Sequence, residues 1–193
     1  RRRQRQMCIR DRMFADYKGQ RKPTPSELSE QFPLARKVLE AMNIAVLELD
    51  NYEADDIIGT FAVHAPQEAD VIIVTGDRDE LQLLSSRTSV YFTKRGISDL
   101  KIYTPEVFAE EYEGLEPKQL IDLKGLMGDT SDNIPGVPSI GEKTATSLIT
   151  TYGSIENAYA HIDEVKPPRA QKALREHYDM AQMSKDLATI RIN

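Results

Sequence analysis

The chain has 193 residues, 40% of them hydrophobic and 29% charged, and its net charge is −6 at pH 7. This composition is typical of a globular protein and excludes a disordered chain. No apolar stretch approaches the roughly 20 residues of a membrane helix, so no membrane is implicated. The single cysteine, Cys8, excludes a disulfide framework and a cysteine-based zinc site, and the three scattered histidines argue against a histidine metal site. Because the Arg-rich start lacks the apolar region of a secretory signal, we expect a reducing, intracellular compartment.

Charge is distributed unevenly along the chain. Residues 1–24 carry nine basic side chains and two acidic ones, whereas residues 50–86 carry nine acidic side chains and one basic one, Arg78. The negative total argues against a nucleic-acid binder, but the basic start and the acidic middle can have separate roles. The acidic middle is either a solvated surface or a site for cations.

Residues 1–12 contain six arginines and no apolar periodicity, which indicates an atypical tail or a junction foreign to the domain. From Met13 to about residue 104, apolar runs typical of strands alternate with segments of helical periodicity. Strands are expected at 44–49, 71–75, 90–93 and 101–103. Helices are expected at 26–42, 54–61 and 78–85. This alternation predicts a parallel sheet in an α/β sandwich.

After Thr104 the periodicity is helical only. Helices are expected at 105–112, 117–127, 139–150, 154–161 and 168–190, the last with a break. We therefore predict an α/β region over residues 13–104, followed by an all-helical region over residues 105–193.

Acidic residues gather at three boundaries between the expected elements. The three clusters are Glu53, Asp55 and Asp56; Asp77 and Asp79; and Asp129 and Asp132. Each cluster alone has a structural explanation: charge at a helix start, a turn or a local salt bridge to Arg78, and the turn after a helix. Asp77 and Asp79 directly follow the expected strand at 71–75, where open α/β sheets place their sites.

Together, the three clusters predict a different chemistry. If the fold brings seven carboxylates to one edge of the sheet, their repulsion has to be offset by bound cations. All-oxygen ligand sets suit Mg²⁺ or Mn²⁺, which also bridge to substrate phosphates. Because two such ions can clamp an in-line attack on phosphorus, the clusters predict phosphodiester hydrolysis.

Residues 134–145, Ile-Pro-Gly-Val-Pro-Ser-Ile-Gly-Glu-Lys-Thr-Ala, predict a phosphate-binding hairpin. Gly136 and Gly141 allow backbone amides to approach a phosphate, the following helix adds the positive end of its dipole, and Lys143 adds a full charge. No side chain suited to reading bases is present, so binding should follow the DNA backbone regardless of sequence. The alternative is a tight turn between two helices. We identify a helix-hairpin-helix element over about residues 128–161.

These motifs and Tyr17-Lys-Gly-Gln-Arg21 occur in an order and spacing that resembles the 5′-3′ exonuclease (5′ nuclease) domain of bacterial DNA polymerase I. The resemblance covers about residues 13–193 and places the chain with the flap endonuclease superfamily. It implies a PIN-like α/β sandwich followed by a helix-hairpin-helix region. The implied activity is structure-selective 5′-3′ exonuclease and 5′ flap endonuclease cleavage in replication and repair.

The resemblance also implies roles for individual residues. Lys18 and Arg21 would be catalytic residues of a helical arch near the scissile phosphate. The metal-site residues, for Mg²⁺ or Mn²⁺ and with two ions expected, would be Glu53, Asp55, Asp56, Asp77, Asp79, Asp129 and Asp132. The DNA-binding residues would be Lys18, Arg21, Lys22, Gly136, Val137, Ser139, Ile140, Gly141, Lys143 and Thr144, with K⁺ held by carbonyls of the hairpin.

The implied partners are DNA with 5′ flaps, nicks or gaps and a polymerase following Asn193. The implied location is the bacterial cytoplasm, at the nucleoid.

One departure from the family concerns the start of the chain. The family begins with a strand that carries a metal-binding aspartate, and a second such strand precedes the arch, but neither is present before Tyr17. Arg10 falls where the family has an arginine before the arch. We therefore expect a fragment without two strands and two carboxylates, and the alternative function is a catalytically impaired, sequence-independent duplex-binding module. A phosphohydrolase of small substrates is a third reading, against which the hairpin argues.

Overall fold

Among the residues that the structure describes, the sheet has three strands, in the order β1-β2-β3. The computed structural model describes residues 9–95 and 99–192, and the sheet consists of β1 (Val71–Thr75), β2 (Thr88–Arg95) and β3 (Asp99–Tyr103). β1 and β2 are parallel, as predicted, but β3 is antiparallel to β2. The reason for the difference is length, because too few residues separate β2 from β3 for the crossover that a parallel pair requires.

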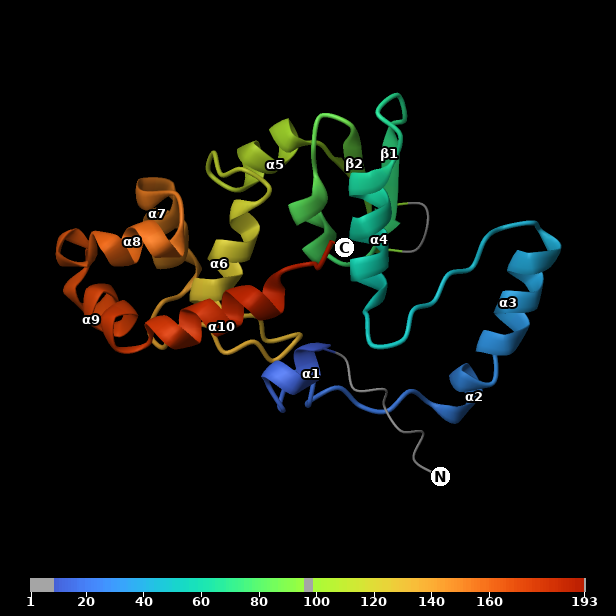
Figure 1. Cartoon of the computed structure of the whole chain (residues 1–193), viewed down its shortest axis with the longest axis horizontal. Helices are drawn as coiled ribbons and strands as arrows, with labels where there is room; N and C mark the ends of the chain where they lie inside the picture. Colours follow the sequence, from blue (N-terminus) through green and yellow to red (C-terminus); the bar gives the residue numbers. More distant parts are fainter. Residues whose placement is uncertain (1–8, 96–98, 193) are drawn as a thin grey trace.

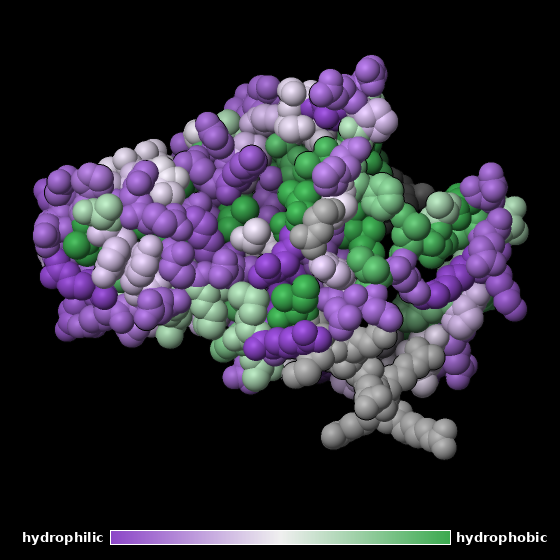
Figure 2. All heavy atoms as spheres, viewed as in Figure 1, coloured by the Kyte–Doolittle hydropathy of each residue, from purple (hydrophilic) through white to green (hydrophobic). Residues whose placement is uncertain are grey.

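Residues 44–49, predicted as a strand, are extended but belong to no strand of the described sheet. Figure 1 shows this segment running from α3 (Phe32–Ala41) to α4 (Ala54–His64) on a path separate from the sheet. Its apolar side chains remain between 41% and 57% exposed. Figure 2 shows further apolar surface around α4 and the neighbouring strands.

The N-terminal helices also differ from the prediction. The single helix expected at 26–42 is two helices, α2 (Ser26–Ser29) and α3, because Pro33 stands in the first turn of α3, where its missing N–H is tolerated. Residues 9–12, expected to be part of a tail, belong to helix α1 (Ile9–Met13), in which Arg10 is buried. Residues 1–8 lie outside the described part of the chain.

The helix expected at 78–85 is a short 3-10 helix, η1 (Asp79–Leu83). Four consecutive residues of this element, 80–83, are buried, so the chain is enclosed on all sides here and has no solvent-exposed helical face.

The all-helical region follows β3, as predicted. It contains α5 (Pro105–Glu111), α6 (Gln119–Met127), α7 (Glu142–Tyr152), α8 (Ile155–Ala160), η2 (Ile162–Glu164), α9 (Pro168–Glu176) and α10 (Tyr178–Ala188). The break expected within 168–190 occurs at His177. α6 packs against α7, α8, α10 and η1, and one hydrophobic core runs from Ile73 in the sheet to Leu174 in α9. Within the described residues, no helix has the length and apolar character needed to cross a membrane.

Candidate metal centre and nucleic-acid interface

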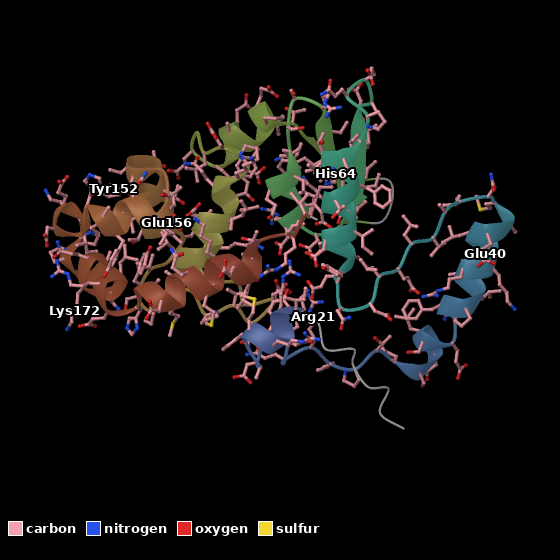
Figure 3. All side chains as sticks on the ribbon, viewed as in Figure 1. Arg21, Glu40, His64, Tyr152, Glu156 and Lys172 are labelled. Carbon is pink, nitrogen blue, oxygen red and sulfur yellow. The ribbon has the colours of Figure 1, made fainter. Side chains whose placement is uncertain are left out.

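The first carboxylate group forms where residues 17–21 meet the start of α4. The Lys18 ammonium lies 2.8 Å from Glu53 Oε2 and 3.3 Å from Asp132 Oδ2, so it bridges two acids that are 79 positions apart in the sequence. The buried Tyr17 hydroxyl donates to the same two carboxylates, and Arg21 donates to Asp132 Oδ1 over 2.5 Å. Figure 3 shows Arg21 beside α1, on the side of the molecule where α4 begins. Lys22, next in the chain, is exposed.

The second carboxylate group surrounds Lys124, a buried lysine on α6 that the sequence analysis did not single out. Its ammonium is hydrogen-bonded to Asp79 and lies 2.7 Å from Asp129 Oδ2. Burial raises the pKa of Asp79 to about 6, although the Lys124 charge opposes the shift. Burial also acts to raise the pKa of Asp129, but hydrogen bonds from Lys124 and Ser131 outweigh it and lower that pKa to about 2. In the sequence, the signal for this buried pairing of Lys124 with two aspartates is a single lysine in the otherwise mostly apolar second half of the helix.

Asp55 and Asp77 link these two groups electrostatically, because Asp55 interacts with Glu53 and Asp77, and Asp77 interacts with Asp79. Burial raises the pKa of Asp55, the charges of Asp77 and Glu53 raise it further, and Lys18 opposes them. Glu80, which the sequence analysis also missed, is 2% exposed, and its Oε2 makes no hydrogen bond. Burial and the charge of Asp55 raise the pKa of Glu80 well above its usual range. Acidic side chains are therefore crowded together at the carboxyl end of β1.

Asp56 has a different environment from the other six predicted metal-site carboxylates. Its two oxygens accept hydrogen bonds of 2.8 and 2.9 Å from the Arg10 guanidinium, and both residues are at most 3% exposed. Asp56 also accepts the backbone N–H groups of Glu53 and Arg191. Because Glu53 and Asp56 form a capping box at the start of α4, Asp56 fixes the position of Glu53.

The donor set of this centre fits a hard divalent cation. Within residues 9–95 and 99–192, no three acidic, histidine or cysteine side chains converge closely enough to hold a metal by themselves. Lys18 and Lys124 lie between the carboxylates and supply positive charge in this arrangement. The remaining donors are carboxylate oxygens, the ligand type that a hard divalent cation prefers.

A cleft of about 690 Å³ joins the carboxylates to the predicted hairpin. Asp77, Asp79 and Asp129 line one part of it, and Gly141 and Glu142 at the start of α7 line another. The cleft therefore connects the candidate metal centre with the candidate phosphate site.

The two hairpin glycines have different structural roles. Gly136 has a φ of +63°, and a Cβ there would lie 2.2 Å from the Gly128 nitrogen, so only glycine fits the packing. Gly141 is exposed at the N-cap of α7 without a side-chain cap, and a Cβ there would meet nothing within 4 Å. The open backbone needed for a phosphate is thus at Gly141.

The other predicted hairpin residues divide into buried and accessible ones. Val137 and Ile140 are buried as whole residues, and their N–H groups already donate to the carbonyls of Leu126 and Val137. Only their carbonyl oxygens keep lone pairs for a ligand. Ser139 and Lys143 are exposed and Thr144 is half-buried. Ser139 also accepts a hydrogen bond of 3.0 Å from Arg169.

Gly141→Ala is expected to weaken duplex binding about tenfold, equally for all sequences, because its methyl group would keep a phosphate from the amide. The free energy of unfolding should fall by less than about 1 kcal/mol, since the site is open. Fluorescence anisotropy with two unrelated duplexes measures the first quantity and urea unfolding the second. The contrasting variant Gly136→Ala should lose roughly 2–4 kcal/mol of stability through overpacking and backbone strain. A dependence on DNA sequence, or a large stability loss in Gly141→Ala, would contradict a backbone-binding role.

Two family models together match nearly the whole chain. The 5′-3′ exonuclease N-terminal resolvase-like domain matches residues 3–113, and the 5′-3′ exonuclease C-terminal SAM fold matches residues 115–193.

Curated relatives are similar to nearly the whole chain. DNA polymerase I of Bacillus caldotenax is 56% identical over 184 residues, which cover 95% of this chain and 21% of the relative. The 5′-3′ exonuclease of Bacillus subtilis (strain 168) is 45% identical over 181 residues, covering 94% of this chain and 60% of the relative. The chain thus spans about a fifth of the polymerase and less than two thirds of the exonuclease.

Solved structures share the fold at low sequence identity. The T5 5′-exonuclease with bound divalent metal ions (zinc) superimposes with a TM-score of 0.75 at 23% identity, covering 93% of this chain and 69% of that one. The catalytic core of Rad2 in complex with DNA substrate gives a TM-score of 0.55 at 17% identity, covering 94% and 60%. Together with the family models, these matches confirm the predicted fold class and resemblance. The chain belongs to the 5′-3′ exonuclease family.

Proposed function

We propose that this chain is a divalent-metal-dependent 5′-3′ nuclease that hydrolyses DNA phosphodiesters at 5′ flaps and at nicked or gapped duplexes. The observation that carries the proposal is the arrangement of four carboxylates on two lysine ammonium groups, with Asp55 and Asp77 as further acidic neighbours and a cleft leading from the Asp77, Asp79 and Asp129 side to Gly141. Family membership supports the reaction class, and the titles of the related T5 and Rad2 structures name divalent ions and a DNA substrate.

In this proposal two Mg²⁺ or Mn²⁺ ions are held by carboxylates from the three clusters. The ligands are Glu53, Asp55, Asp77, Asp79, Asp129 and Asp132, whereas Asp56 holds Glu53 in position. Divalent ions bound there supply Lewis acidity and offset the charge of the scissile phosphate.

Lys18 and Arg21 would donate hydrogen bonds to that phosphate, in exchange for their contacts with Glu53 and Asp132. Lys22 extends this basic segment.

The hairpin binds the duplex backbone through Gly141, Ser139, Lys143 and Thr144, and the carbonyls of Val137 and Ile140 are candidates for K⁺. DNA as the substrate supports a location at the bacterial nucleoid. The similarity to DNA polymerase I supports a polymerase domain as the partner on the same chain.

The alternative is a binding-only module that uses the hairpin without hydrolysis. It is favoured by one observation, that no three potential ligands converge within the described residues. Under this alternative, duplex binding would not depend on a divalent ion.

A 5′-labelled flap duplex separates the two functions. We expect cleavage with Mg²⁺ or Mn²⁺ and none with EDTA, because the carboxylates repel the scissile phosphate without divalent ions. Binding measured in parallel by anisotropy controls for loss of the complex. Duplex binding with no cleavage in either metal would support the binding-only module, and cleavage in EDTA would contradict the metal centre.

A further inference from the structure

Arg78 lies between two proposed metal ligands, Asp77 and Asp79, yet its guanidinium contacts a different part of the molecule. Nη1 donates to Tyr112 Oη over 3.4 Å and lies 3.7 Å from Glu111 Oε1, both at the C-terminal end of α5. The guanidinium carbon lies 5.6 Å from the centre of the Phe92 ring on β2. Arg78 therefore pairs with Glu111 of α5, in place of the local salt bridge to its neighbours considered from the sequence.

The contacts of Arg78 hold its guanidinium against side chains of β2 and of the C-terminal end of α5. The Tyr112 ring stacks on Phe108 with centroids 4.2 Å apart, and Phe108 is fully buried. Glu111 is shared, because Lys101 also pairs with it, so its charge offsets only part of that of Arg78. The Arg78 side chain remains 52% exposed, and a guanidinium has five N–H donors, more than these contacts use.

The charged side chains that line the cleft show that Arg78 supplies accessible positive charge there. Among the described residues, the acids lining the cleft are Asp77, Asp79, Glu111, Asp129 and Glu142, and the bases are Arg78 and Lys124. Lys124 is 6% exposed and is engaged by Asp79 and Asp129. Arg78 is therefore the exposed cation of this lining, among five acidic side chains that repel phosphate.

We propose that Arg78, positioned by Tyr112, binds a backbone phosphate of the DNA duplex between the scissile phosphate and the phosphate at Gly141. The inference rests on the proposed function, since the same cleft joins the carboxylates to the hairpin. An arginine held in this way contacts phosphate oxygens without reading bases, so it binds any sequence at a fixed distance from the cleavage point.

The test replaces single phosphates of a duplex, one at a time, by neutral methylphosphonates, and measures binding by anisotropy in Ca²⁺. In the unsubstituted protein, one position between the scissile phosphate and the hairpin contact should lower affinity about tenfold. Arg78→Ala should bind the native duplex about tenfold more weakly and lose its sensitivity at that one position. The sensitivity at the hairpin position should remain.

Two further variants complete the design. Tyr112→Phe keeps the ring but removes the hydroxyl that holds Arg78, so it should reduce the sensitivity without moving it to another phosphate. Arg175→Ala removes an equal charge from α9, where Arg175 forms an exposed pair with Asp163 of η2, and this variant should bind and respond like the unsubstituted protein.

An unchanged methylphosphonate profile in Arg78→Ala would overturn the inference, and so would equal weakening at every position. Cleavage of the flap substrate in Mg²⁺ or Mn²⁺ is measured separately. If the protein binds the duplex but does not cleave the flap, the nuclease proposal is overturned, and the methylphosphonate binding profile still tests the Arg78 contact. If the unsubstituted protein binds no duplex, both proposals fail.

Discussion

Replacing Asp77 and Asp79 together by asparagine is expected to slow DNA cleavage by roughly a thousandfold or more, which corresponds to about 4 kcal/mol of transition-state stabilisation. Both carboxylates line the cleft, and Asp79 is paired with the buried Lys124. Asparagine keeps the size of each side chain, and its oxygen can still accept the Asp79 N–H that Asp77 accepts. The substitutions therefore remove the charge that would hold divalent ions while preserving the local turn.

Duplex affinity should persist or increase in this double variant, because two negative charges facing phosphate are removed. Single-turnover cleavage of a 5′-labelled flap and anisotropy with the same DNA measure the two quantities. A matched control is Glu68→Gln with Asp70→Asn, which removes two exposed carboxylates just before β1, at the opposite end of that strand. The control should cleave at the unsubstituted rate. Equal losses of binding and cleavage in the Asp77 and Asp79 variant would indicate a structural role.

The features of the site that could be predicted from the sequence are those determined by residues close together in the chain. An apolar β-branched run predicted β1, and the acids after it lie at its carboxyl end, where parallel strands place functional groups. The hairpin was predicted from glycine spacing and the helix that follows, and α7 begins at Glu142, close to the predicted start. Each of these two signals is contained within a short stretch of sequence, so each could be predicted without knowledge of the tertiary structure.

The parts that did not follow from sequence depend on contacts between distant segments. Lys124 and Glu80 are buried, whereas pattern reasoning assigns charged side chains to the surface unless their partners are known. The apolar run at 44–49 has the composition of a strand, but a strand also needs a neighbour to pair with, which periodicity does not supply. Arg10 falls within a segment without apolar periodicity, and its partner Asp56 is 46 positions away.

Arg10→Ala is expected to lower the free energy of unfolding by about 3–5 kcal/mol, because it leaves the Asp56 carboxylate buried without its counter-charge. The guanidinium also donates to the backbone carbonyls of Leu187, over 3.0 Å, and Thr189, over 2.6 Å. It therefore connects α1 to the start of α4 and to the end of α10, three segments from distant parts of the sequence. Urea unfolding at pH 7 measures the loss.

Two further substitutions show whether the loss comes from this ion pair. Arg10→Lys keeps the positive charge but loses the planar fork that binds both Asp56 oxygens, so an intermediate loss is expected. Arg12→Ala removes an exposed charge from the same helix and should change stability by less than about 0.5 kcal/mol. Since Asp56 also holds the backbone of Glu53, the Arg10 variants should bind divalent ions more weakly as well, which isothermal titration with Mn²⁺ can measure. Equal stability of Arg10→Ala and Arg12→Ala would show that the buried pair does not hold these segments together.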